Sequence, residues 1–190
     1  MDASGQPSGF LTVRVTHDLL SFFGNAAVSV AIAMEEVGSG SLTSGFFDFT
    51  WTVGSMNPAL LEPFTLQPEK IGAFGNRYEV FSATGEPIAT VQDHKYALFN
   101  TSVTCDYASG RLEINETTKS NLLGIVNLGM QREFTMQGSV NGIINVEDYF
   151  GNYGFDLQYD SASTSGGRLN AILAANLVLL TRSIAEHHRE

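Results

Sequence analysis

The sequence predicts a mostly β fold, a closed antiparallel β-barrel around a hydrophobic C-terminal α-helix. Three observations lead to this prediction. Short stretches of alternating apolar and polar residues recur along most of the chain, separated by glycine-containing turns. The motif Phe-Gly-Asn occurs three times, each time just before such a stretch. The C-terminal segment has a helical pattern and is apolar on nearly every side, and a helix of that kind has to be enclosed.

Length and composition favour one domain. A chain of 190 residues with 43% apolar side chains can bury a core of its own without disulfides or metals. Glycine (19) and phenylalanine (13) are plentiful and charged residues make up only 16%, a mixture typical of a β-rich domain with tight turns. We expect residues 1–9, which are small and polar, to be disordered, and residues 10–190 to form a single barrel domain.

Period-two alternation predicts the first strands. Residues 10–15 alternate and predict a strand. Residues 26–37 fit a strand or a helix, and we favour a strand because the valines and the isoleucine recur at period two. The Gly-Ser-Gly-Ser segment 38–41 indicates a loop, and residues 55–63, with two prolines, indicate a connection. Between these two segments the chain alternates again, with one apolar face made of Phe47, Phe49, Trp51 and Val53.

The later strands are predicted in the same way. Residues 77–92 predict a hairpin that turns at Thr84-Gly85, and residues 96–117 predict a second hairpin. Residues 120–146 indicate two or three short strands separated by glycines. Residues 148–160 predict the last strand.

The segment from about residue 167 to 188 predicts an α-helix, because it is rich in Leu and Ala and has neither Pro nor Gly after its first residue. Its apolar residues cover almost the whole circumference: Leu169, Ile172, Leu173, Leu177, Val178, Leu179, Leu180 and Ile184. We therefore expect the sheet to curl around this helix. The alternative is a helix lying on an open sheet, with its alanines and Asn176 facing solvent.

The repeated motif is more frequent than chance allows, since composition predicts roughly a tenth of one such triplet. The copies are Phe23-Gly24-Asn25, Phe74-Gly75-Asn76 and Phe150-Gly151-Asn152. Gly followed by Asn readily adopts positive φ, so each copy predicts a tight turn that enters a strand, with the phenylalanine anchoring the turn on the core. The apolar positions that follow the second copy are shifted by one residue relative to the other two.

The pattern of an aromatic residue, a glycine turn and a strand, repeated and followed by an apolar C-terminal helix, resembles the tubby C-terminal-like superfamily. The closer resemblance is to its LURP-one-related and phospholipid-scramblase branch. The segments that carry it are IGAFGNRYEVFSATGEPIATV, YFGNYGFDLQY and LNAILAANLVLL, and it covers roughly residues 64–185. The resemblance implies a twelve-stranded β-barrel threaded by the helix.

The chain departs from that family in its charges and cysteines. Tubby proteins bind phosphoinositides through a basic pocket, whereas the ten Lys and Arg residues here are scattered. The calcium-binding stretch and the cysteine cluster of scramblases are also missing from this sequence. The resemblance therefore implies the fold and does not extend to the lipid-binding function of the family.

The net charge of −10 excludes some partners. Nucleic acids need clustered Lys and Arg, and so do anionic membranes, so we expect neither as a partner. The longest apolar run, residues 171–180, is about half of the roughly 20 residues that a transmembrane span needs. Because Cys105 is the single cysteine and no basic start is followed by an apolar run, we expect a cytoplasmic protein without a secretory signal.

No strong catalytic signature is present, and we expect no cofactor. We expect no metal site either. His17 and His94 have no partners at ligand spacing. His187 and His188 lie in the last helical turn, where we favour solvated side chains that complement the helix dipole over the alternative of metal ligands. Cys105 fits a small buried apolar residue better than a nucleophile. If the barrel held a small molecule instead of the helix, acid/base work would fall to polar residues on central strands: Tyr78, Glu79, Asp156 and Tyr159.

Two main hypotheses about function follow. The first is a non-catalytic tubby-like barrel that acts as a binding or scaffold module for a protein or an uncharged lipid surface. The alternative is a small β-barrel enzyme of the cyclase or isomerase type, acting on a hydrophobic small molecule by acid/base chemistry and shape. The first predicts an interior filled by residues 169–184, whereas the second predicts an open apolar cavity. A third hypothesis, a structural subunit of a phage or cell surface, predicts a stable oligomer.

Overall fold

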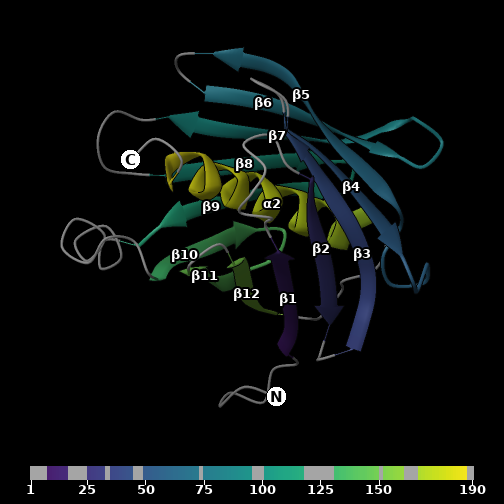
Figure 1. The fold of residues 1–190 in the computed structure, drawn as a ribbon, viewed down its shortest axis with the longest axis horizontal. Coiled ribbons are helices and arrows are strands. Elements are labelled where there is room, and N and C mark those ends of the chain that lie inside the picture. The colour runs from purple at the N-terminus through teal and green to yellow at the C-terminus, as the bar shows by residue number, and fades with distance from the viewer. Residues whose placement is uncertain are drawn as a thin grey trace.

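The part of the chain that the structure describes is a closed antiparallel barrel of twelve strands around an α-helix, and the closed barrel was predicted (Figure 1). The computed structural model describes residues 8–16, 25–32, 35–44, 49–72, 75–95, 101–117, 131–149, 152–160 and 167–187. The elements are β1 (Ser8–Thr16), β2 (Asn25–Ile32), β3 (Glu35–Ser44), β4 (Phe49–Ser55), β5 (Phe64–Gly72), β6 (Gly75–Ser82), β7 (Pro87–Lys95), β8 (Thr101–Tyr107), β9 (Gly110–Glu116), β10 (Gln131–Gly138), β11 (Gly142–Tyr149), β12 (Asn152–Asp160) and α2 (Gly167–His187).

Every strand pairs with its neighbour in sequence, and the ring is closed by β1 and β12. Their ladder runs from Ser8 opposite Asp160 to Thr16 opposite Asn152. Closure gives every one of these strands a neighbour on both sides, although β4 and β5 pair over only three residues each. Along most strands, buried side chains alternate with more exposed ones, so one face points into the barrel and the other outward; in β8, Ser102 to Cys105 are all buried.

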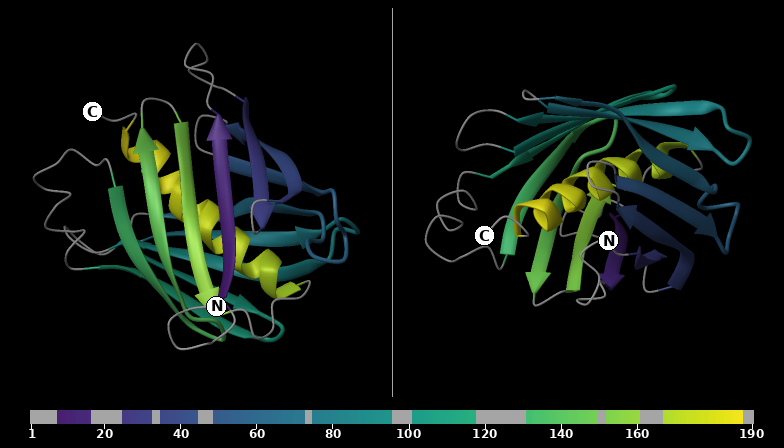
Figure 2. Two further views of the ribbon diagram at one scale, coloured as in Figure 1. Left: turned by 90° about the horizontal axis from the view of Figure 1, so that it is seen from below. Right: turned by 45° about the horizontal axis from the view of Figure 1, so that its top comes forward.

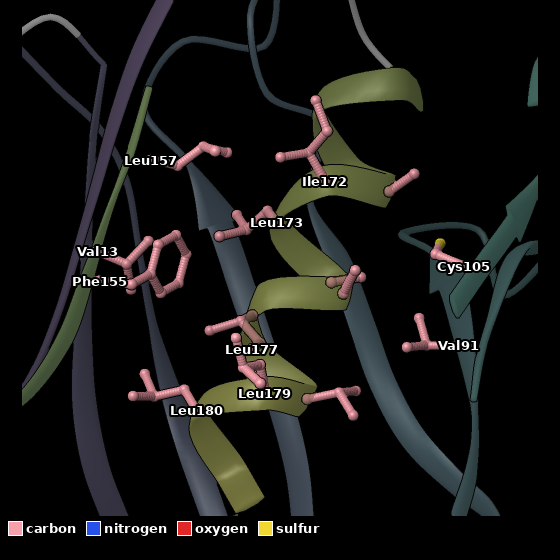
Figure 3. Packing of buried hydrophobic residues seen from close by; sticks show 14 of the residues in the cluster. Val13, Val91, Cys105, Phe155, Leu157, Ile172, Leu173, Leu177, Leu179 and Leu180 are labelled. Carbon is pink, nitrogen blue, oxygen red and sulfur yellow. The ribbon is translucent and has the colours of Figure 1, made fainter. Parts of the chain in front are cut away.

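The helix α2 lies inside the barrel (Figure 2). Every residue from Leu169 to Thr181 is buried, which confirms the enclosed arrangement and rules out the helix on an open sheet. In Figure 3 the helix lies between β-sheet side chains on two sides, with Phe155 and Leu157 on one side and Cys105 on the other. Each fully buried leucine contributes about 1.5–3 kcal/mol to folding, so an apolar circumference is stable only in this position.

The Phe-Gly-Asn copies share one position in the barrel. Asn25 begins β2, Gly75 begins β6 and Asn152 begins β12, so all three copies lie where even-numbered strands start, at one end of the barrel. Their spacings of 51 and 76 residues span four and six strands, which is about 13 residues per strand in both intervals. The remaining members of the copies lie outside the described residues: Phe23, Gly24, Phe74, Phe150 and Gly151.

The structure shows what the one-residue shift of the apolar positions after the second copy does. Gly75 has φ +148°, and a Cβ there would lie 2.3 Å from the carbonyl oxygen of Asp93, so only glycine fits this close approach. The shift puts Asn76 on the inward face together with Tyr78, and the Asn76 amide donates a hydrogen bond to the Tyr78 hydroxyl at 3.4 Å. Asn76 therefore contributes a polar group to the barrel interior.

Several predicted boundaries differ from the structure. Residues 26–37, predicted as one strand, are divided between β2 and β3. Residues 148 and 149, predicted as part of the last strand, belong to β11, and β12 begins at Asn152. The segment 38–41, expected to be a loop, belongs to β3. A Cβ at Gly40 would lie 2.0 Å from the carbonyl oxygen of Thr52, so glycine is needed because β3 approaches β4 closely. At the N-terminus, β1 begins at Ser8 and not at residue 10, while residues 1–7 lie outside the described part of the chain. The helix matches its expected range to within one residue.

Candidate functional site

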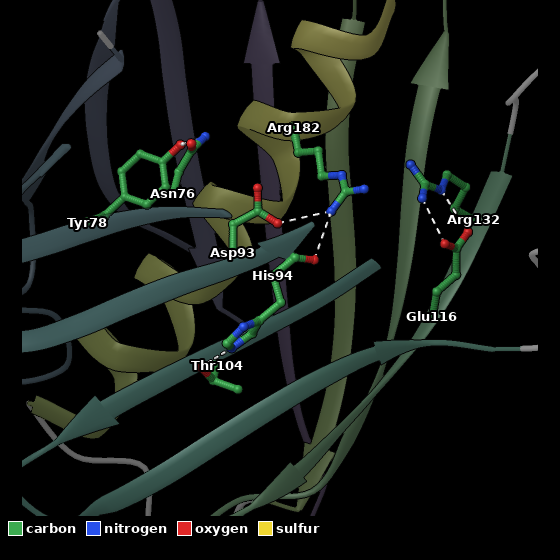
Figure 4. A network of polar contacts seen from close by, with 8 residues as sticks. All are labelled: Asn76, Tyr78, Asp93, His94, Thr104, Glu116, Arg132 and Arg182. Atoms are coloured by element: carbon green, nitrogen blue, oxygen red, sulfur yellow. Dashed lines mark hydrogen bonds and ion pairs between the residues drawn. The ribbon is translucent and has the colours of Figure 1, made fainter. Parts of the chain in front are cut away.

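The polar residues inside the barrel lie mainly at the end where the even-numbered strands begin. Four of them carry charge, and we call them the polar-end cluster: Asp93, Glu116, Arg132 and Arg182 (Figure 4). The first three continue the inward-facing alternation of β7, β9 and β10, and the fourth comes from the last turns of α2. Charged residues in such positions are almost always paired.

Arg182 ties the helix to β7. Its Nη1 donates to Asp93 Oδ1 at 3.0 Å and to the carbonyl oxygen of His94 at 3.5 Å. The side chains of Asp93 and Arg182 are only 3% and 18% exposed. A cation near the C-terminal end of a helix also complements the helix dipole. This ion pair therefore holds the C-terminal half of α2 in place.

The second ion pair joins β9 and β10. Arg132 donates from Nε and Nη2 to the two carboxylate oxygens of Glu116, at 2.9 and 2.8 Å. The Arg132 guanidinium also lies 5.3 Å from the centre of the Phe134 ring, within cation–π range. Bidentate pairing occupies both oxygens and leaves this carboxylate poorly suited to proton transfer.

Tyr78 lies next to the cluster. Burial raises the pKa of the Tyr78 hydroxyl, the hydrogen bond from Asn76 opposes this rise, and the charge of Asp93 adds to it. The phenol therefore stays protonated at neutral pH. Among the residues that the structure describes at this end, two guanidinium groups are therefore paired with two carboxylates.

The helix has two further polar anchors. Asn170 accepts a hydrogen bond from the Glu62 backbone N–H at 3.3 Å and donates one to the Glu62 carbonyl at 3.1 Å. The Trp51 indole N–H donates to Thr181 Oγ1 at 2.7 Å. Together with Arg182, these contacts set the rotation and the depth of α2 within the barrel.

One buried amide on the helix is only half satisfied. Asn176 is 0% exposed, and its Nδ2 donates to the Ile172 carbonyl at 2.8 Å. Within the described residues its Oδ1 has no hydrogen-bond partner. An unsatisfied buried acceptor costs about 1–3 kcal/mol.

The four residues proposed for acid/base chemistry are not brought together. Tyr78 on β6 and Tyr159 on β12 are buried and point inward, but these strands are six places apart in the ring of twelve. Glu79 and Asp156 occupy the alternate, outward-facing positions of the same strands. Asp156 is already paired with Arg14, at 3.0 Å between Nη2 and Oδ2.

Cys105 behaves as a buried apolar residue. It is 0% exposed, and burial, with a smaller contribution from the charge of Asp106, raises the pKa of its thiol to about 12. A thiol with this pKa is neither a nucleophile nor a metal ligand near neutral pH.

The described residues contain no group of three or more His, Cys, Asp or Glu that could hold a metal ion. His94 bonds instead to Thr104, with 3.0 Å between Nε2 and Oγ1. His17 and His188 lie outside the described residues. Nor is any helix in the described ranges long and apolar enough to cross a bilayer.

An open groove of about 680 Å³ is lined by residues of β10, β11, β12 and the β10–β11 turn. Two of the lining residues, Met136 and Tyr159, are buried, and most of the others occupy outward-facing positions. The lining also includes Thr135, Gln137, Asn141, Ile143, Gln158 and Asp160. All of these residues except Asn141 lie on the strands at positions next to buried side chains. We call it the outer groove.

Sequence reasoning missed the polar-end cluster and the outer groove. A signal for the cluster exists, because Asp93, Glu116 and Arg132 each lie two residues from an inward-facing apolar residue of the same strand. The groove has no comparable local signal, since its residues come from three strands whose register the sequence does not reveal.

Comparison with known proteins gave no match to any family model, curated protein or solved structure.

Proposed function

We propose that the chain is a non-catalytic barrel of the tubby-like type and acts as a binding or scaffold module for a protein or an uncharged lipid surface. One observation carries this proposal. The helix occupies the space in which a barrel enzyme would hold its substrate, with Leu169 to Thr181 all buried. Polar anchors from Asn170, Thr181 and Arg182 hold it there.

The architecture supports the tubby-like part of the proposal. Twelve antiparallel strands around an apolar C-terminal helix are what the resemblance of residues 64–185 implies. Fold alone does not carry function, so the binding role is argued from the filled interior and from charge. With a net charge of −10, the partner is a protein or a neutral lipid and not a phosphate-rich surface. A single, buried cysteine fits the cytoplasm, which we propose as its location.

The rival function, a cyclase or isomerase, needs an internal apolar cavity lined by a few convergent polar groups. Tyr78 and Tyr159 point inward from opposite sides of the barrel, and the carboxylates of Glu79 and Asp156 face outward. No observation on the described residues favours this rival.

Titration with a hydrophobic dye, 1-anilinonaphthalene-8-sulfonate, tests the filled interior. We expect no saturable one-to-one binding by the folded protein. Leu173→Ala is the positive control, with benzene in place of the dye. The substitution should leave an apolar cavity beside the helix, and a cavity of that kind stays dry and takes up small apolar molecules. Stoichiometric dye binding inside the barrel of the unaltered protein, and not in the outer groove, would overturn the proposal and favour the enzyme.

Flotation with phosphatidylcholine vesicles, with and without phosphoinositide, tests the partner. We expect phosphoinositide to add no binding. Flotation with phosphatidylcholine alone identifies a neutral lipid surface, and its absence leaves a protein partner. Binding that requires phosphoinositide contradicts the proposal. Size-exclusion chromatography with light scattering measures the oligomeric state. A stable oligomer would favour the third hypothesis, a structural subunit, over a binding module for a lipid or a protein.

A further inference from the structure

The outer groove has a lining unlike the rest of this acidic chain. Across β12, β11 and β10 the outward-facing residues Gln158, Ile143 and Thr135 are directly paired in register. One row further along lie Gln137 and the end of the β10–β11 hairpin at Asn141. Figure 2, left, looks onto the strands that form this surface, with α2 beyond them. The groove volume of about 680 Å³ is within the range of small-molecule sites.

Two amides in the groove are available for a ligand. Gln137 and Gln158 are exposed, and among the described residues neither side chain forms a hydrogen bond. Each offers two donors and a carbonyl acceptor. By contrast, Asn141 and Asp160 bond to one another: the backbone N–H and the amide of Asn141 donate to the two carboxylate oxygens, at 3.0 and 3.2 Å. These bonds make one rim of the groove rigid.

Apolar side chains flank one of the free amides. Gln158 is paired with Ile143 on one side and with Phe10 on the other, and these two are 50% and 41% exposed. A single exposed apolar residue needs no explanation, but here two of the few large ones bracket an unpaired amide. The row therefore offers apolar contact and hydrogen bonding within the same small area.

Charge limits the class of ligand. The groove lining contains no Lys or Arg, so it lacks the partner that a phosphate, sulfate or carboxylate needs. Its one carboxylate, Asp160, already accepts two hydrogen bonds from Asn141, which leaves it poorly placed to bind a cation. An extended peptide would need a free sheet edge to pair with, and the described strands form a closed ring.

We propose that the outer groove binds a neutral carbohydrate. Such a ligand combines hydroxyl groups, which both donate and accept, with apolar C–H faces. Gln137 and Gln158 match the hydroxyl groups, and Ile143 matches the C–H faces, with Phe10 beside the groove as the neighbour of Gln158. The inference concerns only the outer face, so it does not depend on the tubby-like proposal.

An array of neutral hexose and N-acetylhexosamine oligosaccharides, with sialylated and sulfated chains as charged arms, gives the first test. We expect binding to neutral chains only. Titration of a neutral oligosaccharide from the array, followed by the methyl NMR signal of Ile143, then locates the site and shows whether the free sugar suffices without its carrier.

Gln158→Ala is expected to weaken this binding about tenfold, since it removes one or two hydrogen bonds. Gln67→Ala is the matched control, because Gln67 is also an exposed, outward-facing glutamine, on β5, and we expect no change there. Equal thermal midpoints of the two variants show that folding is intact.

Three results would overturn the proposal. The first is no array signal together with no shift of the Ile143 methyl at about 10 mM hexose, well above a millimolar dissociation constant. The second is binding of charged glycans alone. The third is neutral-glycan binding that Gln158→Ala and Gln67→Ala affect equally, which places the site elsewhere.

Discussion

Two buried asparagines on α2 differ in whether the side-chain amide is fully hydrogen-bonded. This difference predicts opposite changes in stability when each asparagine is replaced. Asn170 is 1% exposed, and both polar atoms of its amide bond to the Glu62 backbone. Asn176 is 0% exposed, and its Oδ1 has no partner within the described structure. Leucine has as many side-chain heavy atoms as asparagine, with the same branching. Replacement of each by leucine therefore changes hydrogen bonding more than shape.

The expected changes in the free energy of unfolding follow from the hydrogen bonds that each replacement removes. Asn176→Leu removes an unsatisfied acceptor whose burial costs about 1–3 kcal/mol, and it also removes the hydrogen bond to the Ile172 carbonyl, whose net contribution is smaller. We therefore expect the free energy of unfolding to increase by about 1–2 kcal/mol. Asn170→Leu leaves the N–H and C=O of Glu62 without their partners. Because Glu62 is exposed, water replaces part of this loss, and we expect destabilisation by about 1–2 kcal/mol.

Urea denaturation, with equal slopes for all variants, measures both free energies of unfolding. For a chain of this size, about 1 kcal/mol corresponds to a change in Tm of about 2–4 °C, so the two variants should be separated clearly. Destabilisation by Asn176→Leu as large as that by Asn170→Leu would refute the reasoning. It would mean that Asn176 Oδ1 has a partner in solution.

Three further predictions concern the helix and its surroundings. Cys105 should resist a thiol reagent at pH 8 until the protein unfolds. Burial raises the pKa of this thiol from its ordinary 9.0 to about 12 in the folded state, so the folded protein keeps the proton to higher pH than the unfolded chain. The stability that this difference contributes is complete below pH 9 and should fall between pH 9 and 12, which pH-dependent unfolding measures. Arg182→Met should cost about 3 kcal/mol because it removes the guanidinium group that faces the buried carboxylate of Asp93, while the added change Asp93→Leu should restore most of this loss; no recovery in the double mutant would contradict the pairing. Thr181→Val should cost about 1–3 kcal/mol, because the Trp51 indole N–H loses its acceptor; an unchanged unfolding midpoint would argue against that hydrogen bond.

The barrel was predictable from sequence because two independent patterns agree. Alternation identifies strands such as residues 10–15, but alternation alone does not distinguish an open sheet from a closed one. The apolar circumference of residues 169–180 supplies the missing information, since such a helix has to be enclosed. The Phe-Gly-Asn copies add the strand period, because they mark starts of even-numbered strands.

Long-range contacts explain what the sequence did not predict. Gly38 and Gly40 look like a loop, yet a Cβ at Gly38 would lie 2.7 Å from the Gly54 carbonyl oxygen, so the glycines allow close contact between two strands. Local turn signals cannot express this, because the neighbouring strand is decided by the fold. The polar-end cluster was missed for the same reason: whether Asp93 faces inward depends on the phase of its strand, and its partner Arg182 lies 89 residues away.

Hydrogen exchange of the amides in residues 169–181 tests the central claim, a helix enclosed by the barrel, most directly. These amides should exchange only through global unfolding, with a protection free energy equal to that of β7 and β8. Exchange of this segment through local opening, at a protection far below that of the two strands, would contradict the enclosed helix.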